Sequence, residues 1–109
     1  PNRVRKSIGA EESYADDLTS KQAIYEALGD IADTLERRLD RCQTGGRTIT
    51  LKVKYGDYQQ ITRSRTVLQS ISKRTELLAM ALELLSTTDV EKRSVRLLGL
   101  TVSNLDNSE

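Results

Sequence analysis

Residues 47–66, RTITLKVKYGDYQQITRSRT, predict a β-hairpin around which the rest of the chain can be arranged. A period of two places successive side chains on opposite faces of a strand. In the first half of this segment the apolar face consists of Ile49, Leu51, Val53 and Tyr55, and the polar face of Thr48, Thr50, Lys52 and Lys54. Gly56-Asp57 supplies the turn, because Gly tolerates positive φ and Asp can bond to the local backbone.

The returning half of the hairpin ends in two arginines interleaved with three hydroxyl residues: Thr62, Arg63, Ser64, Arg65 and Thr66. The whole hairpin contains five Lys or Arg residues and one acid, Asp57. We therefore expect one face of the hairpin to be buried and the other to suit a polyanion.

The composition is that of one small globular domain. With 109 residues, 37% hydrophobic and 30% charged, the chain can form a single core and is too apolar for a disordered segment. No apolar run approaches the roughly 20 residues that a membrane-spanning helix needs, so we expect a cytoplasmic protein without membrane contact. Cys42 is the only cysteine, which excludes an internal disulfide, and there is no His. Because the chain begins at Pro1 rather than Met, we expect a piece of a longer protein.

The net charge of +1 hides a separation of charge along the chain. Residues 3–6 include three basic residues and no acid, whereas residues 10–40 include nine acids against Lys21, Arg37 and Arg38. Basic strands and an acidic helix make a dipolar domain that offers nucleic acid one side only.

The segment before the hairpin predicts a strand and a long helix. The strand is expected at residues 3–10, and residues 11–18 are expected to connect it to the helix. Thr19 and Gln22 fit a capping box at the start of this helix, and Gly45-Gly46 should end it. The apolar residues of the helix fall on one stripe: Ile24, Leu28, Ile31, Ala32, Leu35 and Leu39.

The segment after the hairpin predicts a second helix and a last strand. Ser70 or Ser72 can cap the helix, whose expected buried stripe is Leu78, Ala81, Leu82 and Leu85. The last strand is expected at residues 94–103, with residues 104–109 as a frayed tail. Strict alternation cannot place all of its core residues on one face, so we expect a bulge near Arg96-Leu97 that turns Arg96 outward. Those core residues are Val95, Leu98, Leu100 and Val102.

The order of elements is βαββαβ, the split βαβ pattern of an α+β, ferredoxin-like domain. It predicts a four-stranded antiparallel sheet with both helices on one face and a basic, open second face. An open face of Lys, Arg, Thr and Ser suits phosphate contacts, which position a protein on nucleic acid without reading its sequence. The residues expected on it are Arg5, Ser7, Thr48, Thr50, Lys52, Lys54, Thr101 and part of the run 62–66.

The chain resembles the little finger domain of the Y-family DNA polymerases, in particular of the DinB (DNA polymerase IV) branch. Three segments carry the resemblance, in this order and spacing: RKSIGAEE, GRTITLKVKYGDYQQITRSRT and VRLLGLTVSNL. The resemblance covers essentially the whole chain, with residues 1–5 as the end of an interdomain linker. It implies the C-terminal, DNA-gripping domain of a translesion polymerase, whose open sheet holds both backbones of the primer–template duplex.

By motif position, the resemblance assigns DNA contacts to Thr62, Arg63, Ser64, Arg65, Thr66 and Arg96, and to Lys6 and Ser7 in the first segment. Lys52 and Lys54 are expected to add diffuse electrostatic attraction, whereas Thr101 stands where some relatives have a further basic residue. The resemblance implies the polymerase core domains of the same chain as a partner. It also implies Mg²⁺ only in the palm of the parent polymerase, so we expect no cofactor, metal site or catalytic residue here, and no polymerisation by this fragment alone.

The orientation of the arginines stays open at this stage. Ile61, Arg63, Arg65 and Val67 share parity, so a regular strand places both arginines on the side of the two apolar residues. Either a twist or bulge turns the arginines out, or the hydroxyls and backbone N–H groups contact DNA and the arginines flank it.

Alternative functions also stay open. An RNA-recognition-like binder of single strands has the same order of elements, although such modules stack bases on aromatic residues that the segment 59–68 lacks. A protein-interaction domain could dock on a sliding clamp or on the polymerase core through its acidic helix or a sheet edge. An enzyme in its own right would need an unusual site, because no His and no nucleophile–base pair is evident.

Overall fold

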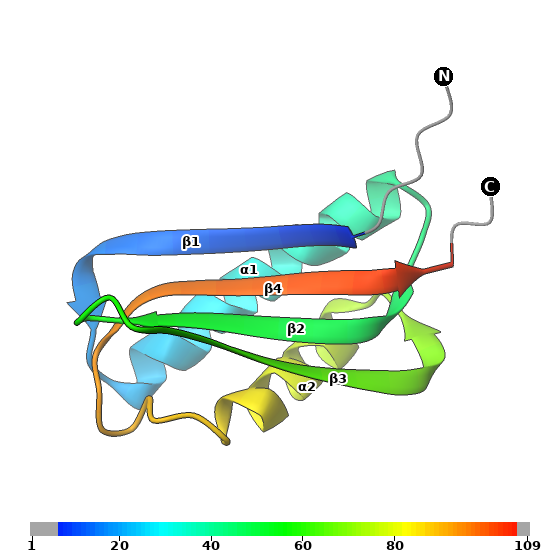
Figure 1. The fold of residues 1–109 in the computed structure, drawn as a ribbon. Coiled ribbons are helices and arrows are strands. Elements are labelled where there is room, and N and C mark those ends of the chain that lie inside the picture. The colour runs from blue at the N-terminus through cyan, green and yellow to red at the C-terminus, as the bar shows by residue number, and fades with distance from the viewer. Residues whose placement is uncertain (1–6, 107–109) are drawn as a thin grey trace.

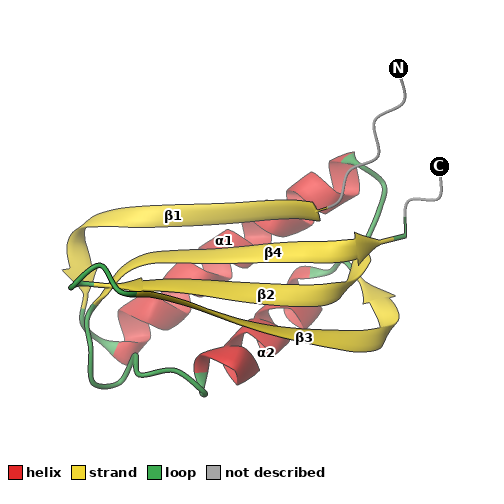
Figure 2. Ribbon diagram, viewed as in Figure 1, coloured by secondary structure: helices red, strands yellow, loops and turns green. Residues whose placement is uncertain are grey.

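A computed structural model describes residues 7–106 and has the predicted βαββαβ order. Its elements are β1 (Ser7–Leu18), α1 (Lys21–Arg41), β2 (Gly46–Tyr55), β3 (Gln60–Ile71), α2 (Arg74–Leu85) and β4 (Val95–Leu105). The four strands form one antiparallel sheet in the order β1-β4-β2-β3. Both helices lie behind this sheet, α1 against β1 and β4 and α2 against β2 and β3 (Figure 1, Figure 2). The predicted fold class is confirmed.

The core lies between the sheet and the helices, and β2 supplies its centre. Ile49, Leu51 and Val53 are fully buried, and Tyr55 is 1% exposed. The predicted stripe of α1 is buried against them, from Ile24 to Leu39. The alternation of β2 and the period of α1 therefore predict the core correctly.

The bulge predicted in β4 is present. Leu97 pairs with Lys54, but Val95 pairs with Tyr55, so Arg96 is the extra residue on β4. This insertion brings Val95 to the face that the other core residues of β4 occupy, and all four are at most 1% exposed: Val95, Leu98, Leu100 and Val102.

The first strand is longer at its C-terminal end than predicted. Residues 11–18, expected to be a connector, belong to β1, which pairs with β4 as far as Ser13 and again at Leu18. This segment lacks the apolar alternation that would have predicted a strand. It is held as a strand by backbone hydrogen bonds to β4, and its polar side chains can lie in solvent because β1 is an edge strand. The rest of the predicted strand, residues 3–6, lies outside the described residues, as do Arg5 and Lys6.

Both ends of α1 differ from the prediction by a few residues. The N-cap is Ser20 rather than Thr19, and its hydroxyl oxygen accepts from the Ala23 N–H at 3.0 Å. The helix ends at Arg41 without using Gly45-Gly46, because Gln43 adopts the left-handed conformation with φ of 54°. The Gln43 N–H donates to the Asp40 carbonyl oxygen at 3.0 Å.

The predicted cap of α2 is wrong, because Ser70 belongs to β3, which extends to Ile71, and Ser72 lies one residue before the N-cap position. Lys73 occupies the N-cap position and makes no side-chain capping bond. A carboxylate of Glu36 from α1 instead accepts from the Arg74 N–H at 3.0 Å. The buried face of α2 is also rotated, since Leu77 and Leu84 are buried in place of the predicted Leu78 and Leu82, which are half-buried.

Neither of the helices in residues 7–106 is both long and apolar enough to span a membrane.

The last strand is also longer than predicted. β4 runs two residues past the predicted Ser103, and its residue Asn104 donates a hydrogen bond to the Thr48 hydroxyl at 2.6 Å.

The burial of β2 predicts how a truncation will act. Leu51→Ala should lower the free energy of unfolding by about 2–5 kcal/mol, because it empties a fully packed site. Urea unfolding followed by circular dichroism measures this change. Leu68→Ala is the matched control: Leu68 is 95% exposed, so its truncation should change stability by less than about 0.5 kcal/mol. Equal losses for the two variants would contradict the burial described here.

Candidate nucleic-acid interface

The face of the sheet away from the helices is lined by short polar side chains. Residues that pair directly across strands share a face, and the pairing sets up rows across the sheet. The first row is Ser7, Ser103, Thr48 and Thr66; the second is Gly9, Thr101, Thr50 and Ser64; the third is Glu11, Gly99, Lys52 and Thr62. Hydroxyl groups therefore dominate the first two rows. The charged side chains of the three rows, Glu11 and Lys52, both lie in the third.

The hydroxyl rows are ordered by contacts among their own members. The Thr48 and Thr66 hydroxyl oxygens are 2.8 Å apart, and Asn104 donates to the former. Gly9 leaves room for Thr101, since a Cβ at position 9 would lie 2.8 Å from the Thr101 hydroxyl oxygen. The half of the open face that these two rows occupy is thus uncharged and rich in groups that can donate to or accept from a nucleic-acid backbone.

The lysines predicted on this face do lie on it, and one of them is paired. Lys52 Nζ is 2.8 Å from a carboxylate oxygen of Glu11, which reaches it from β1. Lys54 lies in the next row, opposite Leu97 and Gln60. The positive charge expected from these strands is therefore partly neutralised on the open face itself.

The arginines of β3 are on the other side of the sheet. Arg63 pairs with Leu51 and Arg65 with Ile49, so both share the helix-covered face. They remain exposed, because β3 is an edge strand. Of the two arrangements left open by the sequence, the structure has the one in which Thr62, Ser64 and Thr66 occupy the open face and the arginines flank it.

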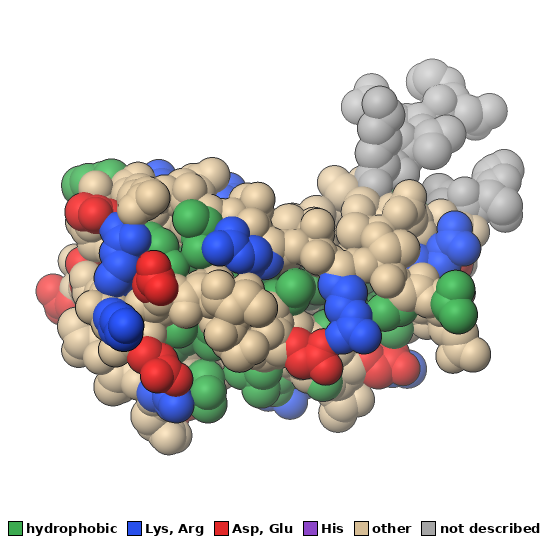
Figure 3. Space-filling view, turned by 60° about the horizontal axis from the view of Figure 1, so that its bottom comes forward, with side chains coloured by type: hydrophobic (Ala, Val, Ile, Leu, Met, Phe, Trp, Pro, Cys, Tyr) green, Lys and Arg blue, Asp and Glu red, His purple; other side chains and the backbone are tan. Residues whose placement is uncertain are grey.

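The two arginines of β3 differ in their partners. Arg65 bonds to Glu83 of α2, whereas Arg63 donates to the backbone carbonyl of Thr62 at 3.0 Å. Figure 3 turns the lower part of Figure 1, with β3 and α2, toward the viewer, and cations and carboxylates lie next to one another there. This edge of the sheet is a mixture of charges rather than an unbroken basic patch.

Arg96 is fixed by contacts at the bulge of β4. Its guanidinium lies over the Tyr58 ring, 4.6 Å from the ring centre. It is also 3.5 Å from Asp17 at the end of β1, and Asp17 accepts a hydrogen bond from the Ser94 hydroxyl at 3.0 Å. The predicted DNA contact Arg96 is therefore oriented by an aromatic ring and a carboxylate.

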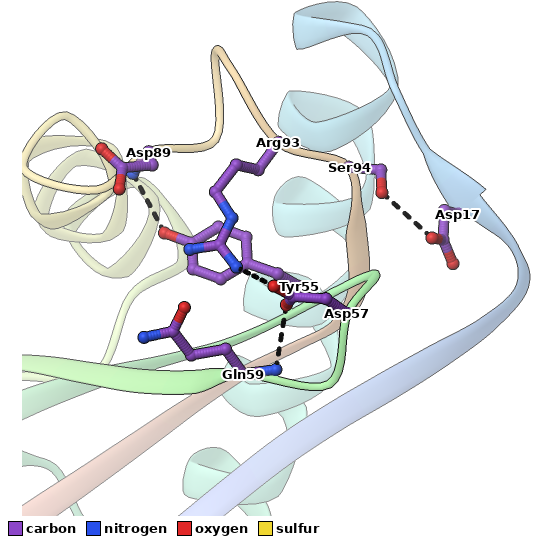
Figure 4. Close-up of polar contacts among 7 residues, drawn as sticks. All are labelled: Asp17, Tyr55, Asp57, Gln59, Asp89, Arg93 and Ser94. Carbon is purple, nitrogen blue, oxygen red and sulfur yellow. Dashed lines mark hydrogen bonds and ion pairs between the residues drawn. The ribbon is translucent and has the colours of Figure 1, made fainter.

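A second arginine, missed by the sequence reasoning, anchors the β2–β3 turn (Figure 4). The Arg93 guanidinium lies 3.8 Å from the centre of the Tyr55 ring and donates to Asp57 at 2.6 Å. The Tyr55 hydroxyl accepts from the Asp89 N–H at 3.0 Å. These contacts join the turn to the loop before β4, and their large separation in sequence left no local signal for them.

The same turn perturbs one carboxyl group. The Gln59 N–H donates to Asp57 at 3.1 Å and is the main cause that holds the pKa of this carboxyl below its ordinary value. Arg93 lowers the pKa further by its charge and its hydrogen bond.

An exposed apolar residue marks the outer edge of β3. Thr66 pairs with Thr48 and Ile71 with Gly46, so β3 advances five residues while β2 advances two. The extra residues bulge outward and leave Leu68 95% exposed, beside a shallow hollow that Val67, Ala79 and Met80 help to line. The sequence reasoning treated Leu68 only as the end of the strand.

Comparison with known proteins identifies the family. Residues 5–109 match the family model described as the impB/mucB/samB family C-terminal domain. The chain belongs to this family. It is 38% identical over 109 residues to DNA polymerase IV 2 of Agrobacterium fabrum and 44% identical over 108 residues to DNA polymerase IV of Gluconobacter oxydans. These alignments cover 100% and 99% of the chain but 30% of each relative.

Solved structures give the same assignment. The chain matches a complex of the beta-clamp processivity factor and the little finger domain of DNA polymerase IV with a TM-score of 0.75 and 26% identity, over 94% of this chain and 92% of that one. A Y-family DNA polymerase chimera shares the fold with a TM-score of 0.74 at 17% identity, over 99% of this chain and 31% of that one. The resemblance to the little finger domain of the DinB branch is confirmed: this is a C-terminal domain of the Y-family DNA polymerase type.

The Asp57 contacts predict a pH titration. Asp57 should titrate below the ordinary value of an aspartate, so its contribution to folding is present above that value and is lost as the pH falls through the lowered pKa. Arg93→Met should raise the pKa of Asp57 only partway, because the Gln59 N–H bond remains. The carboxyl ¹³C shift of Asp57 against pH measures both values.

Arg37→Met is the matched control for this titration, since Arg37 pairs with Asp33 on α1 and should leave Asp57 unchanged. An ordinary pKa for Asp57 in the unsubstituted chain would contradict the interpretation.

Proposed function

We propose that this domain holds primer–template duplex DNA by its phosphate backbone, as part of an error-prone, lesion-bypass DNA polymerase. The observation that carries the proposal is the helix-free face, on which hydroxyl groups from all four strands lie in rows. The family supports it, because the relatives that match the whole chain are DNA polymerases.

In this proposal, hydroxyl groups on the open face and arginines at its edge make different contacts with DNA. Thr62, Ser64 and Thr66 on β3 lie on the open face and can hydrogen-bond to the phosphate and sugar oxygens of a duplex. Arg63 and Arg65 flank the face along the β3 edge, where long side chains reach phosphates beside it. Ser7 and Arg96 join this set from β1 and the β4 bulge, and Lys52 and Lys54 add positive charge on the face.

In this proposal the domain acts by position. It raises the residence time of the polymerase on DNA and sets the path of the template, while nucleotide transfer takes place in the palm of the parent polymerase with its Mg²⁺. The polymerase core domains of the same chain are the second partner. Within residues 7–106 no three carboxylates or thiols lie close enough together to hold a metal ion.

A salt titration tests the DNA contact. The chain should bind a labelled primer–template duplex with little dependence on sequence, and log K should fall with log salt at about −0.9 per neutralised phosphate. Replacing Arg63, Arg65 and Arg96 together by Ala should flatten this slope by about two to three units. Fluorescence anisotropy from about 50 to about 200 mM NaCl measures it.

The control for this titration removes the same charge from α1, which packs against β1 and β4 rather than β3. Lys21, Arg37 and Arg41 lie on α1, and their triple Ala variant should keep the slope of the unsubstituted chain. Absence of binding at the lowest salt, or equal slopes for the two triple variants, would refute the proposal. Tighter binding of single-stranded RNA than of the duplex would favour the RNA-recognition alternative.

Clamp docking is a second candidate function, because a specific surface favours it. Leu68 is 95% exposed on the β3 bulge and lines one shallow hollow together with Val67, Ala79 and Met80, so these side chains form an apolar patch that suits a protein contact. A similar solved structure is a complex of a little finger domain with the beta-clamp. We infer that the β3 edge, rather than the acidic α1 side, is where this chain would meet a sliding clamp.

Leu68→Asp should weaken binding to a purified bacterial sliding clamp by about tenfold or more, with duplex binding changed far less. Surface plasmon resonance measures both. Tyr25→Asp is the matched variant, since Tyr25 is 42% exposed on α1 and should have no effect. Loss of clamp binding with Tyr25→Asp alone would place the contact on the helix side instead.

A further inference from the structure

One carboxylate lies across the middle of the open face. Glu11 on β1 and Lys52 on β2 both pair with Gly99, which stands between them on β4. The Glu11 side chain passes over this glycine to reach the Lys52 ammonium at 2.8 Å. The ion pair therefore spans three neighbouring strands on the face that is proposed to meet DNA.

The glycine makes this crossing possible. A Cβ at position 99 would lie 2.9 Å from the Cβ of Glu11 and 3.4 Å from one of its carboxylate oxygens. The next residue, Glu12, pairs with Leu98 and so belongs to the helix-covered side. Of these two successive acids, only Glu11 is directed onto the open face.

The charge balance of the open face depends on this pair. Lys52 is the cation of the third row, whose other members are Glu11, Gly99 and Thr62. The side chains of Glu11 and Lys52 are 51% and 35% exposed, so a phosphate can reach either of them. A half-exposed ion pair is weak enough to be broken by a competing anion.

We propose that Glu11 limits the affinity of this domain for DNA. It occupies Lys52 and opposes the approach of a phosphate with its own negative charge. The inference rests on the DNA-holding function proposed above and adds a residue that acts against binding. Through Glu11 the domain holds the duplex loosely and releases it readily.

The test compares Glu11→Gln with Glu12→Gln in duplex binding across a salt series. The two variants remove the same charge from neighbouring positions on opposite faces. Glu11→Gln should tighten binding by about two- to fivefold at low salt. It should also steepen the salt slope by about 0.9, because the freed Lys52 can neutralise one more phosphate. Glu12→Gln should leave the slope unchanged.

A second pair of variants separates the release of Lys52 from a general loss of negative charge. With Lys52→Gln in place, adding Glu11→Gln frees no cation, so the salt slopes of the single and double variants should be equal. Dissociation rates from stopped-flow should fall for Glu11→Gln alone. Thermal unfolding of each variant should match that of the unsubstituted chain, since both side chains are substantially exposed.

The outcomes distinguish this inference from the function on which it rests. If the unsubstituted chain binds the duplex and Glu11→Gln behaves as Glu12→Gln does, the inference is overturned and DNA holding stands. The inference is also overturned if Glu11→Gln steepens the slope equally in the presence and absence of Lys52. If the unsubstituted chain does not bind at the lowest salt, both proposals fail.

Discussion

The register of β2 between its two neighbours is the constraint on which the rest of the structure depends. Ile49, Leu51 and Val53 are fully buried, and a shift of one residue would exchange them for Thr48, Thr50 and Lys52. Because paired residues share a face, the register of β2 also assigns a face to every residue paired with it on β3 and β4. The bulge at Arg96 belongs to the same constraint, since without it Val95 would leave the core.

The same constraint explains which parts of the structure could be predicted from the sequence. In β2, α1 and β4 the spacing of apolar residues within the segment reflects which side chains are buried. These patterns therefore predicted the fold and the bulge. The end of β1 and the start of α2 have no such apolar pattern in the sequence. Residues 11–18 are strand because β4 pairs with them, and α2 begins where Glu36 of another helix caps it.

The candidate site was predictable in its residue types but not in its charges. Parity limited Arg63 and Arg65 to two arrangements, and only the pairing with Leu51 and Ile49 selected between them. Counting residues predicted a surplus of cations in the hairpin, yet its Lys52 and Arg65 lie near carboxylates from other elements, Glu11 and Glu83. Arg96 on β4 likewise lies near Asp17. These pairs connect residues far apart in the chain, which no local pattern shows.

Under the DNA-holding function proposed above, neutral hydroxyl rows beside paired cations suit a domain that holds a duplex without fixing it. Hydroxyl groups contact a backbone at short range and read no sequence, whereas free cations would bind the polyanion strongly and from a distance. Pairing Lys52, Arg65 and Arg96 with carboxylates keeps these cations positioned while lowering the field that they present to phosphates. In this proposal the hydroxyl rows determine where the duplex lies, and the ion pairs determine how firmly it is held.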